Sequence, residues 1–310
     1  MEAIVHHHPN SEIEEQRQLF RDARAESTWR AYESDWRVLE GWLTDKGHTV
    51  VLPLSPELVW QFVFAEEKAK RSVATIERRL VTIAKMHQAR RLPDPTKDQS
   101  VREAMQSVRR RSSMRRRGAK QAEPFRLSHI HKAVKEMDTR TRCIVALAFL
   151  SACRRSEITA LNIEDVEVSE EGVAIHIWRS KTDQTGKGRV VFIPDGSGGI
   201  AVNDLVQSWM QVRGEGSGPF FGVCDRTVAT IAKRVARICD LDPSKYSAHS
   251  FRAGFVTEAA ASGVQPHKIM VQTGHRSMDT LMRYVRLGRG FKDSPASDLI
   301  RIETNEEDGS

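Results

Sequence analysis

The sequence predicts a mainly α-helical fold with one small antiparallel β-sheet, arranged as an N-terminal helical bundle followed by an α+β domain. Three observations support this. Apolar residues recur at three- and four-residue steps over residues 11–112, they alternate along residues 166–193, and the helical spacing then returns. With 310 residues, 39% of them hydrophobic, the chain is long enough for about two domains with cores of their own.

Five helices account for the N-terminal part. The third starts with Pro56 directly after Ser55, which is a favourable helix start. The fourth turns residues such as Ile76 and Leu80 inward and places arginines on its other side. That side is either ordinary solvated surface or a face that lies in the major groove of DNA. The expected helices span residues 11–24, 28–46, 56–70, 73–91 and 97–112.

A strongly basic run follows the fifth helix, and no acidic residue occurs between Arg109 and Ala122. Charge runs are usually just solvated, but this one separates two well-patterned regions. We therefore expect an N-terminal domain at residues 1–112, a basic linker at 113–123 that crosses a phosphate backbone, and a second domain at 124–310. The run contains Arg109, Arg110, Arg111, Arg115, Arg116, Arg117 and Lys120.

The second domain is expected to begin with helices at residues 127–137 and 139–153, the latter apolar on nearly all sides and therefore buried. This helix leads into Arg154, a cation that is costly to bury unless something uses it. Glu157 lies one helical turn further on and is able to orient the Arg154 guanidinium. The two residues form either a structural ion pair or part of an anion site.

Three strands follow, because apolar residues alternate along residues 166–168 and 173–177, and Val190, Phe192 and Ile193 form a third short apolar stretch. A long polar hairpin joins the last two strands, and Lys181 stands at its shoulder. Such a lysine normally keeps a loop soluble, but one folded over a DNA strand is able to give a proton to a leaving oxygen.

Two amphipathic helices come next, at residues 200–213 and 225–239. The second carries Arg226 and Lys233 on its outer side, which makes it another candidate for groove contact. A short helix with an exposed apolar side is expected at residues 294–302, near the end of the chain.

The stretch from residue 247 to 286 holds the residues with the clearest chemistry. His249 and Arg252 lie one turn apart in a helical pattern, so they are able to grip one anionic group together. His275 follows in a Gly-His pair, and Tyr284 lies among arginines that make a phenol a better nucleophile. Taken singly, such residues usually belong to a core or a solvated face. Together they suggest covalent attack by tyrosine on a phosphodiester.

The composition narrows the class of protein. A net charge of +7 with 41 acidic residues gives a mixed surface with a basic bias, which is expected of nucleic-acid binders but not confined to them. The four cysteines form no C-x-x-C pair, which favours reduced thiols, and we expect no metal site and no cofactor. There is no apolar run of about 20 residues and no signal peptide, so we expect a cytoplasmic protein without a membrane partner.

Together these residues resemble the tyrosine recombinases, the phage integrase family, in order and spacing over nearly the whole chain. The chain looks most like the Cre-type members, which carry counterparts of STWRAYESDWRVLEGWL, VATIERRLVTIAKMHQARRLPDP, GAKQA and HIWRSKT. His275 departs from the Cre-type pattern, which has tryptophan here, and agrees with the wider family, in which histidine is commoner. No departure removes a catalytic group.

The resemblance implies a C-shaped DNA clamp and a site-specific recombination reaction. Tyr284 attacks a phosphodiester to give a 3′-phosphotyrosyl bond and a free 5′-hydroxyl, and strands then exchange through a Holliday junction without metal or cofactor. Two arginines hold the phosphate, the hairpin lysine protonates the leaving oxygen, His249 accepts the phenol proton or a hydrogen bond, His275 donates to a phosphoryl oxygen, and Glu157 orients Arg154 and His249. The implied catalytic residues are Arg154, Glu157, Lys181, His249, Arg252, His275 and Tyr284.

The resemblance also implies a partner and an assembly. The partner is double-stranded DNA with an inverted-repeat recombination site. A homotetramer forms on two paired sites by exchange of the helix within residues 291–302, and the protein works at the nucleoid of a prokaryote or is encoded by a phage or plasmid. The residues expected to contact DNA are Arg30, Arg78, Arg79, Thr82, Arg115, Arg116, Arg117, Arg226 and Lys233.

Three alternatives compete with this interpretation. A type IB topoisomerase shares the tyrosine chemistry but acts as a monomer, which the terminal apolar helix argues against. A DNA-binding relative that no longer cuts has no need of the complete catalytic set. A basic helical scaffold leaves the hairpin lysine, the arginines and the tyrosine spacing unexplained.

Overall fold

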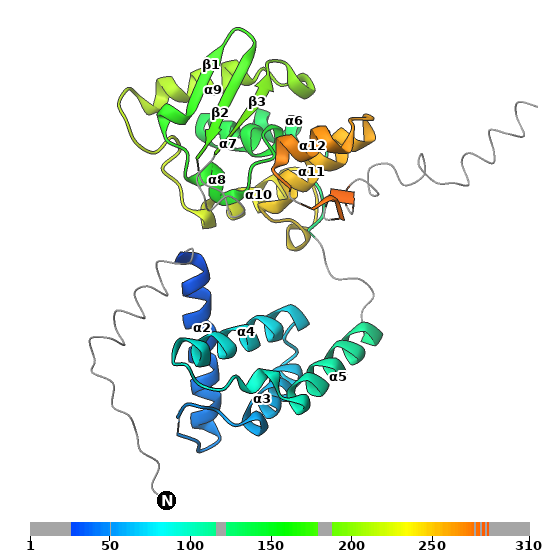
Figure 1. The fold of residues 1–310 in the computed structure, drawn as a ribbon. Helices are drawn as coiled ribbons and strands as arrows, with labels where there is room; N and C mark the ends of the chain where they lie inside the picture. Colours follow the sequence, from blue (N-terminus) through cyan, green and yellow to red (C-terminus); the bar gives the residue numbers. More distant parts are fainter. Residues whose placement is uncertain are drawn as a thin grey trace, which may run out of the picture. The chain divides into compact units, whose positions relative to one another are not determined.

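The computed structural model describes residues 26–49, 51–115, 122–178, 188–275, 277–279, 281–282 and 284. The chain divides into two compact units, Met1–Ala119 and Lys120–Ser310. In the described residues the first unit consists of helices and the second adds a three-stranded sheet (Figure 1), so the expected fold class is confirmed. The expected helices at 11–24 and 294–302 and the hairpin around Lys181 lie outside the described residues.

The described part of the first unit has four α-helices and one 3-10 turn. These are α2 (Glu26–Asp45), α3 (Pro56–Lys68), α4 (Val73–Ala89), η1 (Pro95–Lys97) and α5 (Gln99–Arg115). Ser55 caps α3, since its hydroxyl accepts the Leu58 N–H at 3.3 Å, and Pro56 occupies the first turn. The apolar faces of the helices meet in a core that includes Leu39, Leu43, Phe62 and Ile83.

A buried polar network joins α2, α3 and α4. Asp35 is 2% exposed and Glu66 is 6% exposed, and both pair with the Arg79 guanidinium. Thr82 is 1% exposed, and its hydroxyl donates to Asp35 at 3.3 Å. The outward position expected for Arg79 and Thr82 is therefore wrong. Buried carboxylates need paired and hydrogen-bonded partners, and these two acids hold both side chains inside the unit.

Helix α5 runs to Arg115, so residues 113–115 are helical rather than linker. Acidic residues from other helices offset the repulsion within the basic run. Arg109 Nε donates to Glu77 at 2.8 Å, and Arg111 makes two hydrogen bonds to Glu67, at 2.8 and 2.6 Å. Because these acids lie far from the basic run in the sequence, the sequence alone does not show that they offset its positive charge.

The described part of the second unit combines α-helices with the sheet, and Met278, Asp279, Leu281, Met282 and Tyr284 are also helical. Its α-helices are α6 (Leu127–Glu136), α7 (Thr139–Leu150), α8 (Arg155–Thr159), α9 (Val202–Arg213), α10 (Asp225–Ile238), α11 (His249–Ala261) and α12 (Pro266–Thr273). Its strands are β1 (Val166–Ser169), β2 (Gly172–Ile177) and β3 (Arg189–Pro194), and its 3-10 turns are η2 (Ile163–Asp165), η3 (Ser197–Gly199) and η4 (Pro243–Lys245).

Helix α7 forms the centre of the second unit. Every residue from Cys143 to Leu150 is buried, and the helix packs against α6, α9 and α11. The burial expected from its uniformly apolar sequence is confirmed. The helix ends at Leu150 instead of residue 153, because Ala152 adopts a left-handed conformation with φ of 50° and turns the chain into α8.

The sheet is antiparallel throughout, with strand order β1-β2-β3. Val173 of β2 is opposite both Val168 of β1 and Ile193 of β3. Burial alternates along β3: Val191 and Ile193 face the core, whereas Val190 and Phe192, which the sequence analysis named for this strand, are exposed. Arg189 lies on the same face of β3 as Val191 and Ile193, is half buried, and is next to the candidate active site.

The beginning of the second unit crosses α11. The backbone N–H of Glu123 donates to Lys245, and that of Phe125 donates to Ser250 at 3.1 Å. Gly254 makes this crossing possible, since a Cβ there would come within 2.2 Å of the Phe125 carbonyl oxygen. Residue 123 was expected in the linker, but in the structure its backbone N–H is bonded to Lys245 at the end of η4, within the second unit.

Candidate active site

His249 and Tyr284 meet at the beginning of α11. His249 is the first residue of this helix, and its Nε2 lies 2.7 Å from the Tyr284 hydroxyl. The tyrosine ring is 6% exposed and packs in a cluster with Val256, Ile269 and Leu281. The ring is therefore held by apolar contacts, while its hydroxyl has a hydrogen-bond partner that is able to exchange protons.

The surroundings favour the neutral form of His249. Burial lowers the pKa of this imidazole below its ordinary value of 6.5, and the cations Arg252 and Arg154 lower it further. A neutral ring has one nitrogen without a proton. In the tautomer with its proton on Nδ1, His249 accepts the phenol proton of Tyr284 at Nε2, which is the geometry needed for general-base assistance.

Arg252 lies one turn further along α11 and is almost fully buried, with 3% exposure. Its Nη1 donates to two carbonyls, that of Ala152 at 2.7 Å and that of Thr273 at 2.6 Å. Burial, followed by repulsion from Arg154, lowers the pKa of the guanidinium from 12.5 to about 10, so it remains a cation at neutral pH. The left-handed turn at Ala152 aims one of these carbonyls at the arginine.

Arg154 and Glu157 form a local ion pair at α8. Arg154 Nη1 donates to Glu157 Oε1 at 2.7 Å, and the Arg154 backbone N–H donates to Oε2 at 2.8 Å. Nη2 of Arg154 lies 3.4 Å from the Gly274 carbonyl. The carboxylate thus caps α8 and orients the arginine. Glu157 was expected to orient both Arg154 and His249. Its described contacts include Arg154 but not His249.

His275 follows the left-handed Gly274 that ends α12. Its Nδ1 is 2.7 Å from the Thr273 hydroxyl, which also donates to the Ile269 carbonyl at 2.7 Å. Because that hydroxyl gives its proton to the carbonyl, the imidazole carries its own proton on Nδ1 and presents Nε2 as an acceptor. Burial, followed by repulsion from Arg252, lowers the pKa of His275 to about 4.

Known proteins with similar sequences and structures identify the family. Residues 120–289 match the phage integrase family. The chain belongs to this family. It is 30% identical to an integrase/recombinase xerD homolog of Selenomonas ruminantium over 88% of this chain and 85% of that protein. It is 25% identical to the recombinase cre of Escherichia phage P1 over 92% of this chain and 90% of that protein.

A solved structure shares the fold. The Tn1549 transposon integrase in complex with circular intermediate DNA has a TM-score of 0.62 and 14% identity, covering 94% of this chain and 98% of that chain. The membership of the phage integrase family that the sequence suggested is thus confirmed, and so is the mainly helical fold with its small sheet.

In this phage integrase family member, the structure brings most of the implied catalytic residues into one constellation. His249 contacts Tyr284, Arg252 and Arg154 each bond to the residues that precede His275, and Glu157 holds Arg154. Lys181 lies outside the described residues.

One residue of this constellation was not predicted. Arg189, the first residue of β3, donates from Nη2 to Glu157 Oε2 at 2.8 Å. A sequence signal did exist, since an arginine interrupts the apolar row of core-facing positions that continues with Val191 and Ile193. It was missed because its partner belongs to another element, 32 residues earlier.

Tyr246 is the other tyrosine close to α11, and its environment does not suit a nucleophile. Its hydroxyl donates to Glu123 at 3.2 Å, and its ring stacks on Phe125 with centroids 4.7 Å apart. Burial, together with the Glu123 charge, raises the pKa of Tyr246 to about 12. Tyr284, with a histidine on its hydroxyl, is the better candidate.

The residues expected to contact DNA are distributed unequally. Arg226 and Lys233 are exposed on one side of α10, and Arg30 is exposed on α2. Arg78 is half exposed, and its Nη2 donates to Asp35 at 2.7 Å. Arg79 and Thr82 are buried, so they cannot contact DNA as expected. Arg115 is the last residue of α5, and Arg116 and Arg117 lie outside the described residues.

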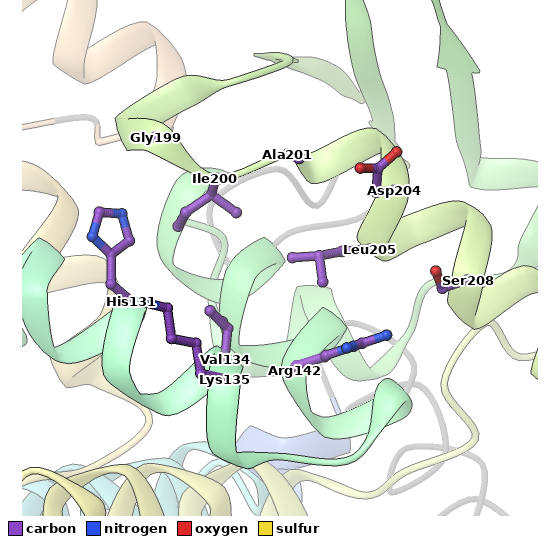
Figure 2. A pocket seen from close by; sticks show the side chains of 10 residues that line it. All are labelled: His131, Val134, Lys135, Arg142, Gly199, Ile200, Ala201, Asp204, Leu205 and Ser208. Carbon is purple, nitrogen blue, oxygen red and sulfur yellow. The ribbon is translucent and has the colours of Figure 1, made fainter.

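A pocket of about 370 Å³ lies elsewhere in the second unit, between α6, α7 and α9. Figure 2 shows His131 and Lys135 on one side of it and Asp204 and Leu205 on another, with Arg142 at the base. No residue of the constellation around Tyr284 lines it, so it is separate from the candidate active site.

In the part of the chain that the structure describes, no three His, Cys, Asp or Glu side chains cluster in a way that would hold a metal ion. No described helix is long and apolar enough to cross a membrane.

Proposed function

We propose that this phage integrase family member is a site-specific DNA recombinase in which Tyr284 attacks a DNA phosphodiester. The observation that carries the proposal is the 2.7 Å contact between the Tyr284 hydroxyl and His249, one helical turn from the buried Arg252. The related proteins named as recombinases, cre and the xerD homolog, support the same activity over most of their length.

The proposed first step exchanges one phosphate ester for another. The phenol oxygen of Tyr284 bonds to phosphorus while His249 Nε2 takes its proton, and the bond from phosphorus to the 5′-oxygen breaks. A 3′-phosphotyrosyl ester and a 5′-hydroxyl result. We assign protonation of the leaving oxygen to Lys181, which rests on the resemblance of the hairpin sequence alone. The phosphotyrosyl ester keeps the free energy of the broken phosphodiester bond, so the step is reversible without a cofactor.

In this proposal the two arginines stabilise the negative charge that builds up on the phosphate in the transition state. Nη1 of Arg252 is occupied by two backbone carbonyls, and these bonds fix the orientation of the whole planar guanidinium. Arg154 is fixed in turn by Glu157. Pre-oriented cations in a site with little water stabilise a pentacoordinate transition state strongly, and losing one such donor typically lowers a rate by about 100- to 1000-fold.

The donor role that the resemblance implies for His275 requires a protonated ring. With its proton on Nδ1, Nε2 is unable to donate to a phosphoryl oxygen until the ring is protonated. A bound phosphate is an anion that favours this protonation, because it counteracts the surrounding cations. We therefore assign His275 a donor role only in the DNA complex.

The proposal extends to partner, domains and assembly. The partner is double-stranded DNA with inverted repeats, contacted by Arg30 and Arg78 in the first unit and by Arg226 and Lys233 on α10. The first unit acts as the DNA-binding domain and the second as the catalytic domain, with residues 116–121 within the basic connection. A homotetramer that exchanges the segment around residues 291–302 completes the proposal and rests on the sequence resemblance.

The test combines selection and trapping. Purified protein is used to select bound DNA from a random library, and the recovered site is rebuilt with a nick, so that the cleaved fragment diffuses away and the covalent adduct accumulates. We expect inverted repeats with an adduct on each arm for the wild type. Tyr284→Phe is expected to bind the same DNA within about twofold and to form no adduct, since only the hydroxyl is removed.

Each other outcome contradicts part of the proposal. An adduct in Tyr284→Phe would move the nucleophile to another residue, with Tyr246 and Tyr32 as the remaining tyrosines. Binding without any wild-type adduct would indicate a DNA-binding relative that no longer cuts. Relaxation of supercoiled DNA that lacks the selected site would indicate a topoisomerase.

A further inference from the structure

Glu157 is shared between two arginines from different elements. Its side chain is 1% exposed. One oxygen accepts from Arg154 Nη1 at 2.7 Å, and the other accepts both the Arg154 backbone N–H and Arg189 Nη2, each at 2.8 Å. Arg189 approaches from β3, the strand that follows the hairpin bearing Lys181.

Arg189 also lies against the turn that carries His275. A Cβ on Gly274 would come within 2.9 Å of Arg189 Nε, so the guanidinium fills the space beside this left-handed glycine. Its Nη1 is 3.5 Å from the Gln272 carbonyl, and its Nη2 is 3.9 Å from Cys153 Sγ. One side chain thus touches the glutamate that orients Arg154 and the loop that presents His275.

We propose that Arg189 is a positioning residue for DNA cleavage, which holds Glu157 and the Gly274 turn so that Arg154 and His275 meet the same phosphate. The proposal rests on the recombinase function above and adds a residue to it. Arg189 acts through its neighbours, since its side chain is only 20% exposed and contacts Glu157, Cys153 and the loop before His275.

The charges explain why a second arginine matters. Arg154, Glu157 and Arg189 together carry one net positive charge, whereas Arg154 and Glu157 alone carry none. Without Arg189 the buried carboxylate has a single cationic partner, which draws the Arg154 guanidinium toward Glu157 and weakens its pull on a phosphate. The space left beside Gly274 also permits the His275 turn to shift.

The expected consequence depends on charge in the substrate. A misplaced Arg154 lowers the cleavage rate of a phosphodiester, because the transition state gains negative charge. In a methylphosphonate a methyl group replaces one charged oxygen, so the same displacement lowers its cleavage rate much less. A merely structural defect slows both substrates alike. The ratio of the two cleavage rates therefore separates positioning from stability.

The experiment compares Arg189→Gln and Arg189→Lys with wild type in single-turnover cleavage of both substrates. Arg155→Gln is the matched control, because Arg155 is adjacent to Arg154 and pairs with Asp225 instead of Glu157. We expect Arg189→Gln to cleave the phosphodiester about 100-fold more slowly and the methylphosphonate within about threefold of wild type. Arg189→Lys is expected in between, since lysine keeps the charge without the planar fork.

A second readout needs no catalysis. The His275 imidazole is titrated by NMR in the DNA-free protein, with His275→Gln identifying its signal. In Arg189→Gln we expect the pKa of His275 to rise from about 4 toward its ordinary 6.5, because a loosened turn exposes the ring. Failure of the proposed function appears separately, as a wild-type protein that forms no adduct.

Two results would overturn the positioning role. One is an equal loss of rate on both substrates together with an unchanged His275 titration. The other is wild-type cleavage of the phosphodiester by Arg189→Gln. If wild type forms no adduct, the titration alone decides: a shifted pKa supports the role of Arg189 in holding the turn, and an unshifted one removes it.

Discussion

Thr273 contacts two side chains of the proposed active site at once. Its carbonyl accepts from Arg252, and its hydroxyl bonds to His275 Nδ1. Replacement by valine keeps the size of the side chain and removes only the hydroxyl, which leaves the imidazole N–H short of a partner. We expect Thr273→Val to cleave DNA about 10-fold more slowly and to lose about 1–3 kcal/mol of stability, measured by single-turnover assays and urea unfolding.

Thr273→Ser is the control for this prediction. Serine restores the hydroxyl at the same place, so its cleavage rate is expected within about threefold of wild type. Equal rates for the valine and serine variants would mean that the hydroxyl does not position His275.

If His249 is the base, as proposed, its lowered pKa predicts the pH dependence of cleavage. Its folded pKa lies below 6.5, so the ring is already neutral and able to accept a proton above that pH. We expect the cleavage rate at subsaturating protein to stay level as the pH falls from 8 to 6.5, and to decline only below, as His249 becomes protonated. With DNA in saturating excess, the pH dependence of the rate would instead report the groups that titrate in the protein–DNA complex.

The pH profile has its own control in His249→Gln. Glutamine is unable to take the phenol proton, so its rate is expected to be about 100-fold lower and to lose the decline assigned to His249. The same decline at the same pH in this variant would assign the titration to another group.

At the scale of elements, helix α4 holds two neighbouring arginines in different surroundings. Arg79 is buried with Asp35 and Glu66, whereas Arg78 is half exposed. We expect Arg79→Met to lower the free energy of unfolding by about 3–5 kcal/mol, because it leaves buried carboxylates without their cation. Arg78→Ala is expected to cost about 1 kcal/mol or less and to weaken DNA binding.

Urea unfolding followed by circular dichroism, together with DNA-binding titrations, distinguishes the two arginines. Similar losses of stability in both variants would contradict the division of tasks. So would a normal affinity for DNA in Arg78→Ala.

The same helix shows what the sequence was able to predict. Apolar spacing predicted the bounds of α2 to α7, α9 and α10 to within a few residues, because amphipathic patterns report directly which face is buried. It placed Arg79 outside, although this residue is next to the inner face marked by Ile76, Leu80 and Ile83. Its partners Asp35 and Glu66 come from two other helices, and a helical period carries no information about them.

The candidate active site was predictable for a related reason. Arg154 with Glu157 and His249 with Arg252 are each one turn apart, so their spacing is visible in a single helix. Arg189 was missed, since it joins the constellation only through the folding of β3 onto α8. The left-handed turn at Ala152 was also missed, because apolar spacing does not indicate where a buried helix ends.

At the scale of the whole molecule, both units are proposed to hold one DNA. If so, Arg78 of the first unit and Arg226 of the second contribute to the same binding equilibrium. Each cation that neutralises a phosphate makes the plot of log affinity against log salt steeper by about 0.9, since it releases condensed counterions. We expect Arg78→Ala and Arg226→Ala each to reduce the slope by about this amount, and the double variant to reduce it by about 1.8.

Lys132→Gln is a suitable control for this measurement. Lys132 is partly exposed and pairs with Asp240, and it belongs to neither proposed DNA face. Its slope is expected to match the wild type, so a change there would mean that net charge alone governs binding. A slope unchanged by Arg78→Ala but reduced by Arg226→Ala would leave only the second unit on the phosphates, and the clamp would have to be abandoned. Additive losses would instead show that one DNA is bound by residues from both units.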